Sequence, residues 1–115
     1  MTYAMFIDDE RWPKDATWAK WYGSRDNWVV VRNWTETYDT IKNLGFPNFI
    51  SFDHDLGDPD AEPTGFEIAK MLVDYDMDEY MEIPADFQFS VHSQNPIGKK
   101  NIESYLNNYL EHRGK

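Results

Sequence analysis

The chain has 115 residues, which suffices for one domain with a sizeable hydrophobic core but not for two. Hydrophobic residues make up 41% and aromatic residues 17% of it, and this composition excludes a disordered chain. The 21 acidic and 11 basic residues give a formal charge of -10, which argues against general nucleic-acid binding. Away from a functional site, the same acidity would serve solubility alone.

Cysteine is absent, which excludes disulfides, thiolate metal sites and a cysteine nucleophile. The N-terminal run Thr2 to Ile7 is too short for a signal peptide and has no basic region before it. No apolar stretch approaches the length that spans a membrane. We therefore expect a soluble, cytoplasmic domain over residues 1–115 without a membrane partner, and its oligomeric state stays open.

Apolar runs alternate with helical patterns along the chain. The first run, Thr2 to Ile7, stops abruptly at Asp8, as a buried strand that ends in a polar loop does. Asp15 can cap a brief helix that ends at Gly23 and carries three aromatic residues on one face: Trp18, Trp21 and Tyr22. The β-branched run Trp28 to Val31 indicates a second strand.

The middle of the chain continues this alternation. Thr35 opens a helix that ends at Gly45, and the run Phe49 to Phe52 predicts a third strand. Thr64 and Glu67 have the spacing of a capping box, which predicts the start of a third helix.

A fourth strand and a final helix complete the pattern. Phe87 to Val91 is β-prone, and Asn95 followed by Pro96 is typical of an N-cap and the first residue of a helix. Strands that alternate with helices predict βαβ units, and therefore an α/β fold with a parallel sheet, right-handed crossovers and helices on both faces.

Polar residues follow three of the predicted strands. Asp8 and Asp9 follow the first, Asp53 to Asp55 the third, and His92 to Asn95 the fourth. The C-terminal ends of parallel strands lie at one edge of the sheet, where such folds bind ligands. We therefore expect the three clusters to meet there.

Four aspartates in these clusters predict a divalent cation: Asp8, Asp9, Asp53 and Asp55. Crowded carboxylates repel one another and would partly protonate unless a cation neutralises them. Oxygen ligands suit Mg²⁺ or Mn²⁺, whereas ligation by His54 and His92 would widen the choice to Fe²⁺ or Zn²⁺. The alternative is that the aspartates cap loops through hydrogen bonds with backbone amides.

Further side chains near this edge could hold phosphate oxygens. Arg11, Lys99 and Lys100 are suitable cations, although the lysines could equally be solvated charges in a first helical turn. Ser93 could donate to a phosphate, act as nucleophile, or bond the local backbone. Asn95 has the competing role of N-cap.

The five tryptophans allow two interpretations. They are Trp12, Trp18, Trp21, Trp28 and Trp34. Aromatic side chains can stack a nucleobase. At helical and strand spacing, however, they are more often part of the core.

Several of these motifs resemble response-regulator receiver domains. Phe6 to Glu10 is similar to their acidic strand-one motif, and Asp53 lies where their phosphoacceptor aspartate would be. Thr64 to Ala69 is similar to the start of their third helix, and Ser93 lies near their strand-four Ser or Thr. The resemblance implies a receiver-like (flavodoxin-like) three-layer sandwich, here with four parallel strands, in which Asp8 and the following aspartate hold Mg²⁺ together with Asp53.

The chain also departs from the receiver pattern. Receivers carry a lysine on a fifth strand, and here the pattern is truncated after the fourth βα unit, so the lysine has no counterpart. The His54-Asp55 pair and the segment His92 to Pro96 are not receiver features. With them, the motifs resemble the receiver-like family proposed to process cyclic phosphates, which is found in bacteria and phages. This resemblance implies a phosphoesterase that acts on cyclic nucleotides or cyclic-phosphate ends of RNA, in a bacterium or a phage-infected host.

The leading hypothesis is metal-dependent hydrolysis of a cyclic phosphoester. A metal on the four aspartates would polarise the phosphoryl group and generate hydroxide. His54 and His92 would be general base and acid, and Asp53 as covalent nucleophile is the variant closest to receivers. The rival is a non-catalytic receiver that binds a metal, a nucleotide signal or a protein partner. A phosphorelay is disfavoured by the absent lysine.

Overall fold

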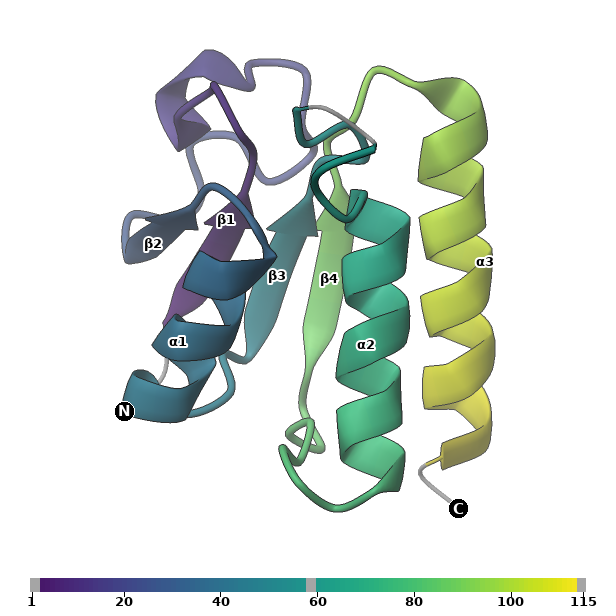
Figure 1. Ribbon diagram of the computed structural model, residues 1–115. Helices are drawn as coiled ribbons and strands as arrows, with labels where there is room; N and C mark the ends of the chain where they lie inside the picture. The colour runs from purple at the N-terminus through teal and green to yellow at the C-terminus, as the bar shows by residue number, and fades with distance from the viewer. Residues whose placement is uncertain (1–2, 58–59, 114–115) are drawn as a thin grey trace.

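A computed structural model describes residues 3–57 and 60–113, and these residues form a four-stranded parallel sheet with three α-helices (Figure 1). The strands are β1 (Ala4–Ile7), β2 (Trp28–Val31), β3 (Phe49–Phe52) and β4 (Gln88–Val91). The helices are α1 (Trp34–Leu44), α2 (Gly65–Met77) and α3 (Pro96–Arg113), and a short 3-10 helix, η1 (Pro13–Asp15), follows β1. The predicted α/β fold with four parallel strands is confirmed. Thr2, the first residue of the predicted first strand, lies outside the described residues.

The strand order is β2-β1-β3-β4, and every neighbouring pair is parallel. The chain therefore steps from β1 to one side, crosses back over β1 to β3, and continues in that direction to β4. Right-handed connections then place the β1–β2 connection on one face and the connections through α1 and α2 on the other. The direction reverses between β1 and β3, which is the switch point where such sheets bind ligands.

The two faces of the sheet are covered differently. Met5 and Ile7 of β1 point to the face covered by helices, where they pack with side chains of α2 and α3, including Ile68. The alternate residues of β1 point to the opposite face, where Phe6 packs with Trp21 of the β1–β2 connection. In Figure 1, α1 and α2 lie in front of the sheet, and α3 lies beside α2. The prediction of helices on both faces was therefore wrong for the second face.

The predicted helix from Asp15 to Gly23 does not form. Asp15 instead ends the three-residue helix η1, and turns follow it. Two indole N–H groups in this connection make tertiary hydrogen bonds: Trp18 donates to the carbonyl oxygen of His92 at 2.7 Å and Trp21 to Ser51 Oγ at 2.9 Å. The first contact is made just after the end of β4, and the second is made within β3. Together they set the path of the β1–β2 connection, and they outweigh a weak local helix propensity.

The other helix starts follow local capping. Thr64 and Glu67 form the predicted capping box, with Glu67 N donating to Thr64 Oγ1 at 3.2 Å and Thr64 N to Glu67 Oε1 at 2.9 Å. Helix α1 begins at Trp34, one residue before the predicted start, because Asn33 is its N-cap. In the part of the chain that the structure describes, no helix is long and apolar enough to cross a membrane.

The first residue of α2 touches the end of β3. Gly65 N donates to the His54 carbonyl oxygen at 2.8 Å, and a Cβ atom at Gly65 would lie 1.8 Å from the Asp53 carbonyl oxygen. The helix can approach Asp53 this closely only because residue 65 has no side chain. Gly65 therefore holds the third strand end against α2.

Gly65→Ala is expected to destabilise the domain by about 1–3 kcal/mol, since backbone must move to admit the methyl group. Urea unfolding measures this loss, with Lys70→Ala on an exposed position of α2 as the control for helix propensity. Equal stability of Gly65→Ala and wild type would show that the contact is loose.

Candidate functional site

Three polar side chains form a row at the C-terminal edge of the sheet: Asp8, Asp53 and His92. Each follows the last residue of its strand, and its backbone amide donates to a carbonyl of the neighbouring strand, at 3.2, 2.9 and 2.9 Å respectively. Neighbouring strands lie about 4.8 Å apart, so residues at the same level can touch. All three residues are buried. The predicted convergence of strands one, three and four is therefore present in the structure.

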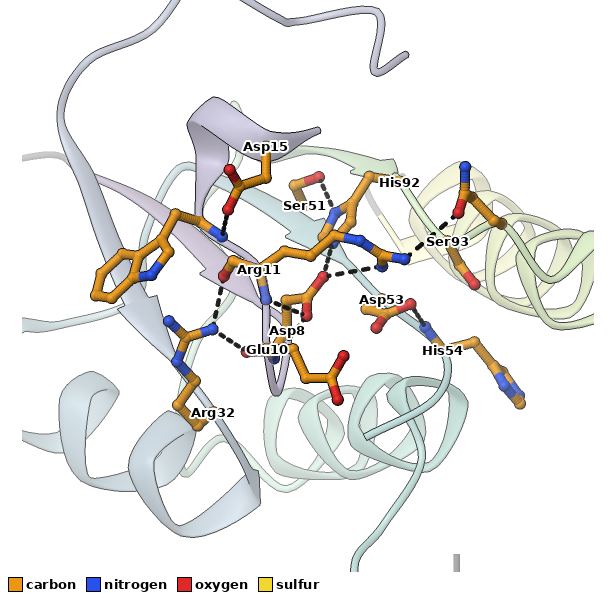
Figure 2. A network of polar contacts seen from close by, with 12 residues as sticks. Asp8, Glu10, Arg11, Asp15, Arg32, Ser51, Asp53, His54, His92 and Ser93 are labelled. Carbon is orange, nitrogen blue, oxygen red and sulfur yellow. Dashed lines mark hydrogen bonds and ion pairs between the residues drawn. The ribbon is translucent and has the colours of Figure 1, made fainter. Parts of the chain in front are cut away.

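The Asp8 carboxylate is held by four contacts (Figure 2). Its Oδ1 accepts from the backbone amides of Glu10 and Arg11, each at 2.9 Å. Its Oδ2 lies 3.0 Å from His92 Nε2 and 3.5 Å from Arg11 Nη1. Burial by itself would raise the pKa of Asp8, but the hydrogen bonds from His92 and the two amides outweigh it and lower the pKa to about 2. Asp8 is thus an ionised buried carboxylate, and it also caps its loop.

The His92 imidazole is fixed at both nitrogens. Nδ1 lies 2.7 Å from Ser51 Oγ, which accepts from Trp21 Nε1 at 2.9 Å. Because the indole N–H can only donate, the Ser51 hydroxyl can give its proton to Nδ1, which leaves the imidazole proton on Nε2, facing Asp8. Phe6 stacks on the imidazole at 4.4 Å between ring centroids. His92 is therefore oriented as a donor to Asp8.

Asp53 is the member of the row that reaches solvent. Its Oδ1 accepts from the backbone amide of His54 at 2.9 Å. Burial, followed by the nearby charge of Asp8, raises the pKa of Asp53 to about 6. The two neighbouring carboxylates therefore have pKa values shifted in opposite directions, and a bound cation would remove the repulsion between them.

A cleft of about 510 Å³ lies beside Asp53. The segments after β1, β3 and β4 line it, with Asp9, Glu10, Arg11, Asp53, Asp55, Gly57, Ser93, Gln94 and Asn95. A larger hollow of about 590 Å³ lies over α2 and Tyr105, away from the strand ends. We place the site in the first cleft because Asp53 belongs both to its lining and to the buried row.

His54 does not join the row. Its Nδ1 lies 2.9 Å from Asp55 Oδ1, and its ring packs on the start of α3, where a Cβ atom at Gly98 would lie 2.3 Å from His54 Cγ. Figure 2 shows the His54 ring directed away from Asp8 and His92. The structure therefore brings only one of the two predicted histidines to Asp8 and Asp53.

The donor atoms of Asp8, Asp53 and His92 lie within 4.8 Å of one another, so this group could hold a metal ion. Two buried carboxylates, one of which resists ionisation, fit a hard divalent cation. The His92 proton on Nε2 favours a role for this residue in orienting Asp8 rather than in ligation. The other two predicted ligands, Asp9 and Asp55, line the cleft, and the Asp55 side chain is 67% exposed.

The predicted phosphate-binding residues separate into two groups. Arg11, Ser93 and Asn95 line the cleft, whereas Lys99 lines a neighbouring groove and Lys100 is exposed on α3. Ser93 Oγ accepts from the Asn95 amide at 3.1 Å, which is the local bond considered as its alternative role. Asn95 Oδ1 accepts from the third residue of α3 at 3.0 Å, so its predicted capping role is confirmed.

Sequence reasoning missed three supporting residues. Ser51 and Trp21 hold His92, and Arg32 donates to the carbonyl oxygens of Asp8 and Arg11 at 2.8 and 2.6 Å. Ser51 had one usable signal, because it lies two residues before the strand-end aspartate and therefore on the same face of β3. The tryptophan and Arg32 are joined to the site only by contacts between distant segments.

A parallel sheet in this order, with an acidic site at its switch point, defines a receiver-like domain. The model of a family described as the cyclic-phosphate processing receiver domain matches residues 3–108. The chain therefore belongs to this family, as its motifs predicted, and the family name indicates a role in cyclic-phosphate processing. A comparison with curated proteins finds no match.

The raised pKa of Asp53 predicts a pH-dependent effect of Asp53→Asn. The folded state binds the proton more tightly, with a pKa of about 6 against 3.8 for the free group, so ionisation costs stability as pH rises through this window. In metal-free buffer, Asp53→Asn is expected to be about 2 kcal/mol more stable than wild type at pH 8, a gain that shrinks towards pH 4. Urea unfolding at several pH values measures it.

The exposed carboxylate of Asp39 on α1 supplies the control, and Asp39→Asn is expected to show no such trend. A gain for Asp53→Asn that is the same at pH 4 and pH 8 would contradict the assigned origin of the effect.

Ser51→Ala should leave His92 Nδ1 without its hydrogen-bond partner. It leaves Trp21 Nε1 without its buried acceptor, so we expect a loss of about 1–3 kcal/mol in unfolding free energy. In nitrogen-15 NMR of the imidazole, the Nδ1 signal is expected to shift towards that of a nitrogen without a hydrogen bond, while the proton stays on Nε2, which faces the ionised Asp8. Ser104→Ala on an exposed position of α3 is the control, and an unchanged imidazole spectrum in Ser51→Ala would contradict the hydrogen-bond chain.

Proposed function

We propose that the domain is a metal-dependent phosphoesterase that opens a cyclic phosphate, either of a cyclic nucleotide or of an RNA 2′,3′-cyclic end. The observation that carries this proposal is the buried pair Asp8 and Asp53 beside a cleft that also presents Arg11 and Ser93. Family membership supports a cyclic phosphate as the substrate class.

Asp8 and Asp53 are the proposed ligands of a divalent ion, with Asp9 and Asp55 nearby in the cleft. Carboxylate ligands favour Mg²⁺ or Mn²⁺. Such an ion, when bound, polarises a phosphoryl oxygen and makes a water molecule more acidic. His92 acts on this chemistry through Asp8, whose orientation it sets.

Two cleft residues are suited to hold the phosphate. Arg11 lies 3.5 Å from Asp8 Oδ2 and 3.4 Å from Gln94 Oε1, and its guanidinium has further N–H groups for an anion. Ser93 Oγ accepts from a backbone amide and keeps its own O–H for a phosphate oxygen. Arg11 and Ser93 therefore offer N–H and O–H donors to a phosphate bound close to Asp53.

The reaction adds one water molecule across one ester bond. The water oxygen bonds to phosphorus, the P–O bond to one ribose oxygen breaks, and a phosphate monoester results. Asp53 is the carboxylate of the row that faces the cleft, so we assign it the acceptance of the water proton. The leaving ribose oxygen takes its proton from solvent, to which the cleft opens.

This assignment differs from the expectation that two histidines act as base and acid. Both nitrogens of His92 face protein partners, Ser51 and Asp8, and His54 packs on α3. The proposal therefore gives His92 a positioning role and gives His54 none in the chemistry.

The protein contacts of both histidines favour a second candidate function. A site whose histidines are both engaged elsewhere suits a receiver that binds a metal and a nucleotide without turnover. This candidate predicts thermal stabilisation by the ligand and no product.

Turnover of 2′,3′-cyclic AMP and 3′,5′-cyclic AMP with Mg²⁺ or Mn²⁺ tests the proposal. We expect a monoester product from wild type and a loss of about a hundredfold or more for Asp8→Asn and Asp53→Asn, because each removes a ligand charge. His92→Gln is expected to weaken metal affinity by roughly tenfold, the effect of a lost orienting bond.

Asp39→Asn is the control and should retain full turnover. Thermal stabilisation of wild type by the nucleotide and metal without any product would favour the second candidate. Neither product nor stabilisation, with these nucleotides and with an RNA that carries a 2′,3′-cyclic phosphate, would reject both functions.

A further inference from the structure

A second hollow, lined by Trp18, lies near the cleft, because Trp18 contacts the cleft residue Arg11. It has a volume of about 260 Å³ and lies between the β1–β2 connection, β4 and the first turns of α3. Trp18, Lys20, Lys99 and Glu103 belong to its lining. We call it the Trp18 groove.

Trp18 connects this groove with the cleft. Its Nε1 donates to the His92 carbonyl oxygen at 2.7 Å, directly before the cleft residue Ser93. The guanidinium of Arg11, another cleft residue, lies 5.2 Å from the centroid of the Trp18 ring. The ring is 42% exposed, although its N–H is fixed. Trp18 is thus an oriented aromatic side chain that lines the groove and contacts Arg11 of the cleft.

The charged residues are distributed unevenly along the chain. Residues 11–32 contain five basic and two acidic residues, whereas the remaining chain contains six basic and nineteen acidic ones. The basic ones are Arg11, Lys14, Lys20, Arg25 and Arg32. Of these, Arg11 lines the cleft and Lys20 lines the Trp18 groove, whereas Lys14 and Arg25 line a separate hollow. Lys20 and Lys99 of α3 thus place two positive charges in the groove. Such a local field attracts an anion that the net charge would repel.

We propose that the Trp18 groove binds the nucleotide preceding a 2′,3′-cyclic phosphate end, so that the substrate is single-stranded RNA rather than a free mononucleotide. This inference rests on the proposed function. With the cyclic phosphate beside Asp53, the chain passes Trp18, which stacks on a base, while Lys20 and Lys99 hold the preceding phosphate. Aromatic stacking with adjacent cations is how single strands are bound without base-specific contacts.

Glu103 allows a test in which the expected change in RNA affinity is opposite to that of the lysine variants. Its carboxylate lines the same groove as the two lysines and opposes a phosphate there. Removal of a lysine charge should therefore weaken RNA binding, and removal of the Glu103 charge should strengthen it. A general effect of protein charge would not depend on where the charge lies.

The first experiment measures binding, which needs no turnover. The probe is a fluorescein-labelled tetranucleotide RNA with a 3′-phosphate, and anisotropy gives its affinity for the full chain. Lys20→Gln and Lys99→Gln are each expected to weaken binding about fivefold, as loss of an exposed ion pair does. Each should also reduce the slope of log affinity against log salt by roughly 0.7. Glu103→Gln should bind more tightly.

Lys70→Gln on α2 is the matched control, because it removes the same charge from a different hollow, over α2. We expect it to bind like wild type. Equal weakening by Lys70→Gln and the groove variants, or no weakening by Lys20→Gln and Lys99→Gln, would overturn the inference.

The second experiment compares turnover of the same RNA carrying a 2′,3′-cyclic phosphate with that of 2′,3′-cyclic AMP. We expect a higher kcat/KM for the RNA, and the lysine variants should lower it for the RNA alone. Equal kcat/KM values for the two substrates would overturn the inference and leave the phosphoesterase standing. Turnover of neither would reject the phosphoesterase, and the binding experiment would still decide the groove.

Discussion

The buried hydrogen bond between Asp8 Oδ2 and His92 Nε2 joins the ends of β1 and β4 across the end of β3. Both side chains are fully buried, and each has a further hydrogen-bond partner, the backbone amides after β1 for Asp8 and Ser51 for His92. His92 is also hydrogen-bonded to Ser51, which accepts from Trp21. These hydrogen bonds attach the β1–β2 connection to the sheet. Loss of one partner would leave a buried charge or donor uncompensated, so the site and the fold share this contact.

The same contact creates the electrostatic asymmetry of the site. Asp8 receives hydrogen bonds at both oxygens and stays ionised, with a pKa of about 2. Asp53, beside this charge and with fewer donors, has its pKa raised to about 6. One fixed negative charge next to a carboxylate that resists ionisation is an arrangement that a divalent cation relieves. The cleft beside Asp53 also contains Arg11, whose guanidinium lies 3.5 Å from Asp8 Oδ2.

Alternation along a strand explains both a success and a failure of sequence reasoning. Consecutive residues of an extended chain point to opposite sides, so Asp53 lies on the face of Asp8 and His92, and His54 points away towards α3. Counting His54 with the aspartates used proximity along the chain and ignored this alternation. The helix expected from Asp15 does not form, for a different reason. The spacing of its aromatic residues also suits a non-helical segment, which Trp18 and Trp21 attach to two strands through hydrogen bonds.

The sequence by itself determined the four strands, their parallel arrangement, and the meeting of Asp8, Asp53 and His92 at one edge. These features follow from short-range patterns, namely where an apolar run stops and which residue comes next. Only the tertiary structure decided that His92 faces inward as a donor and that His54 packs on α3. It also decided which basic residues line the cleft. Such choices depend on hydrogen bonds and packing between segments far apart in the chain, and no local pattern encodes them.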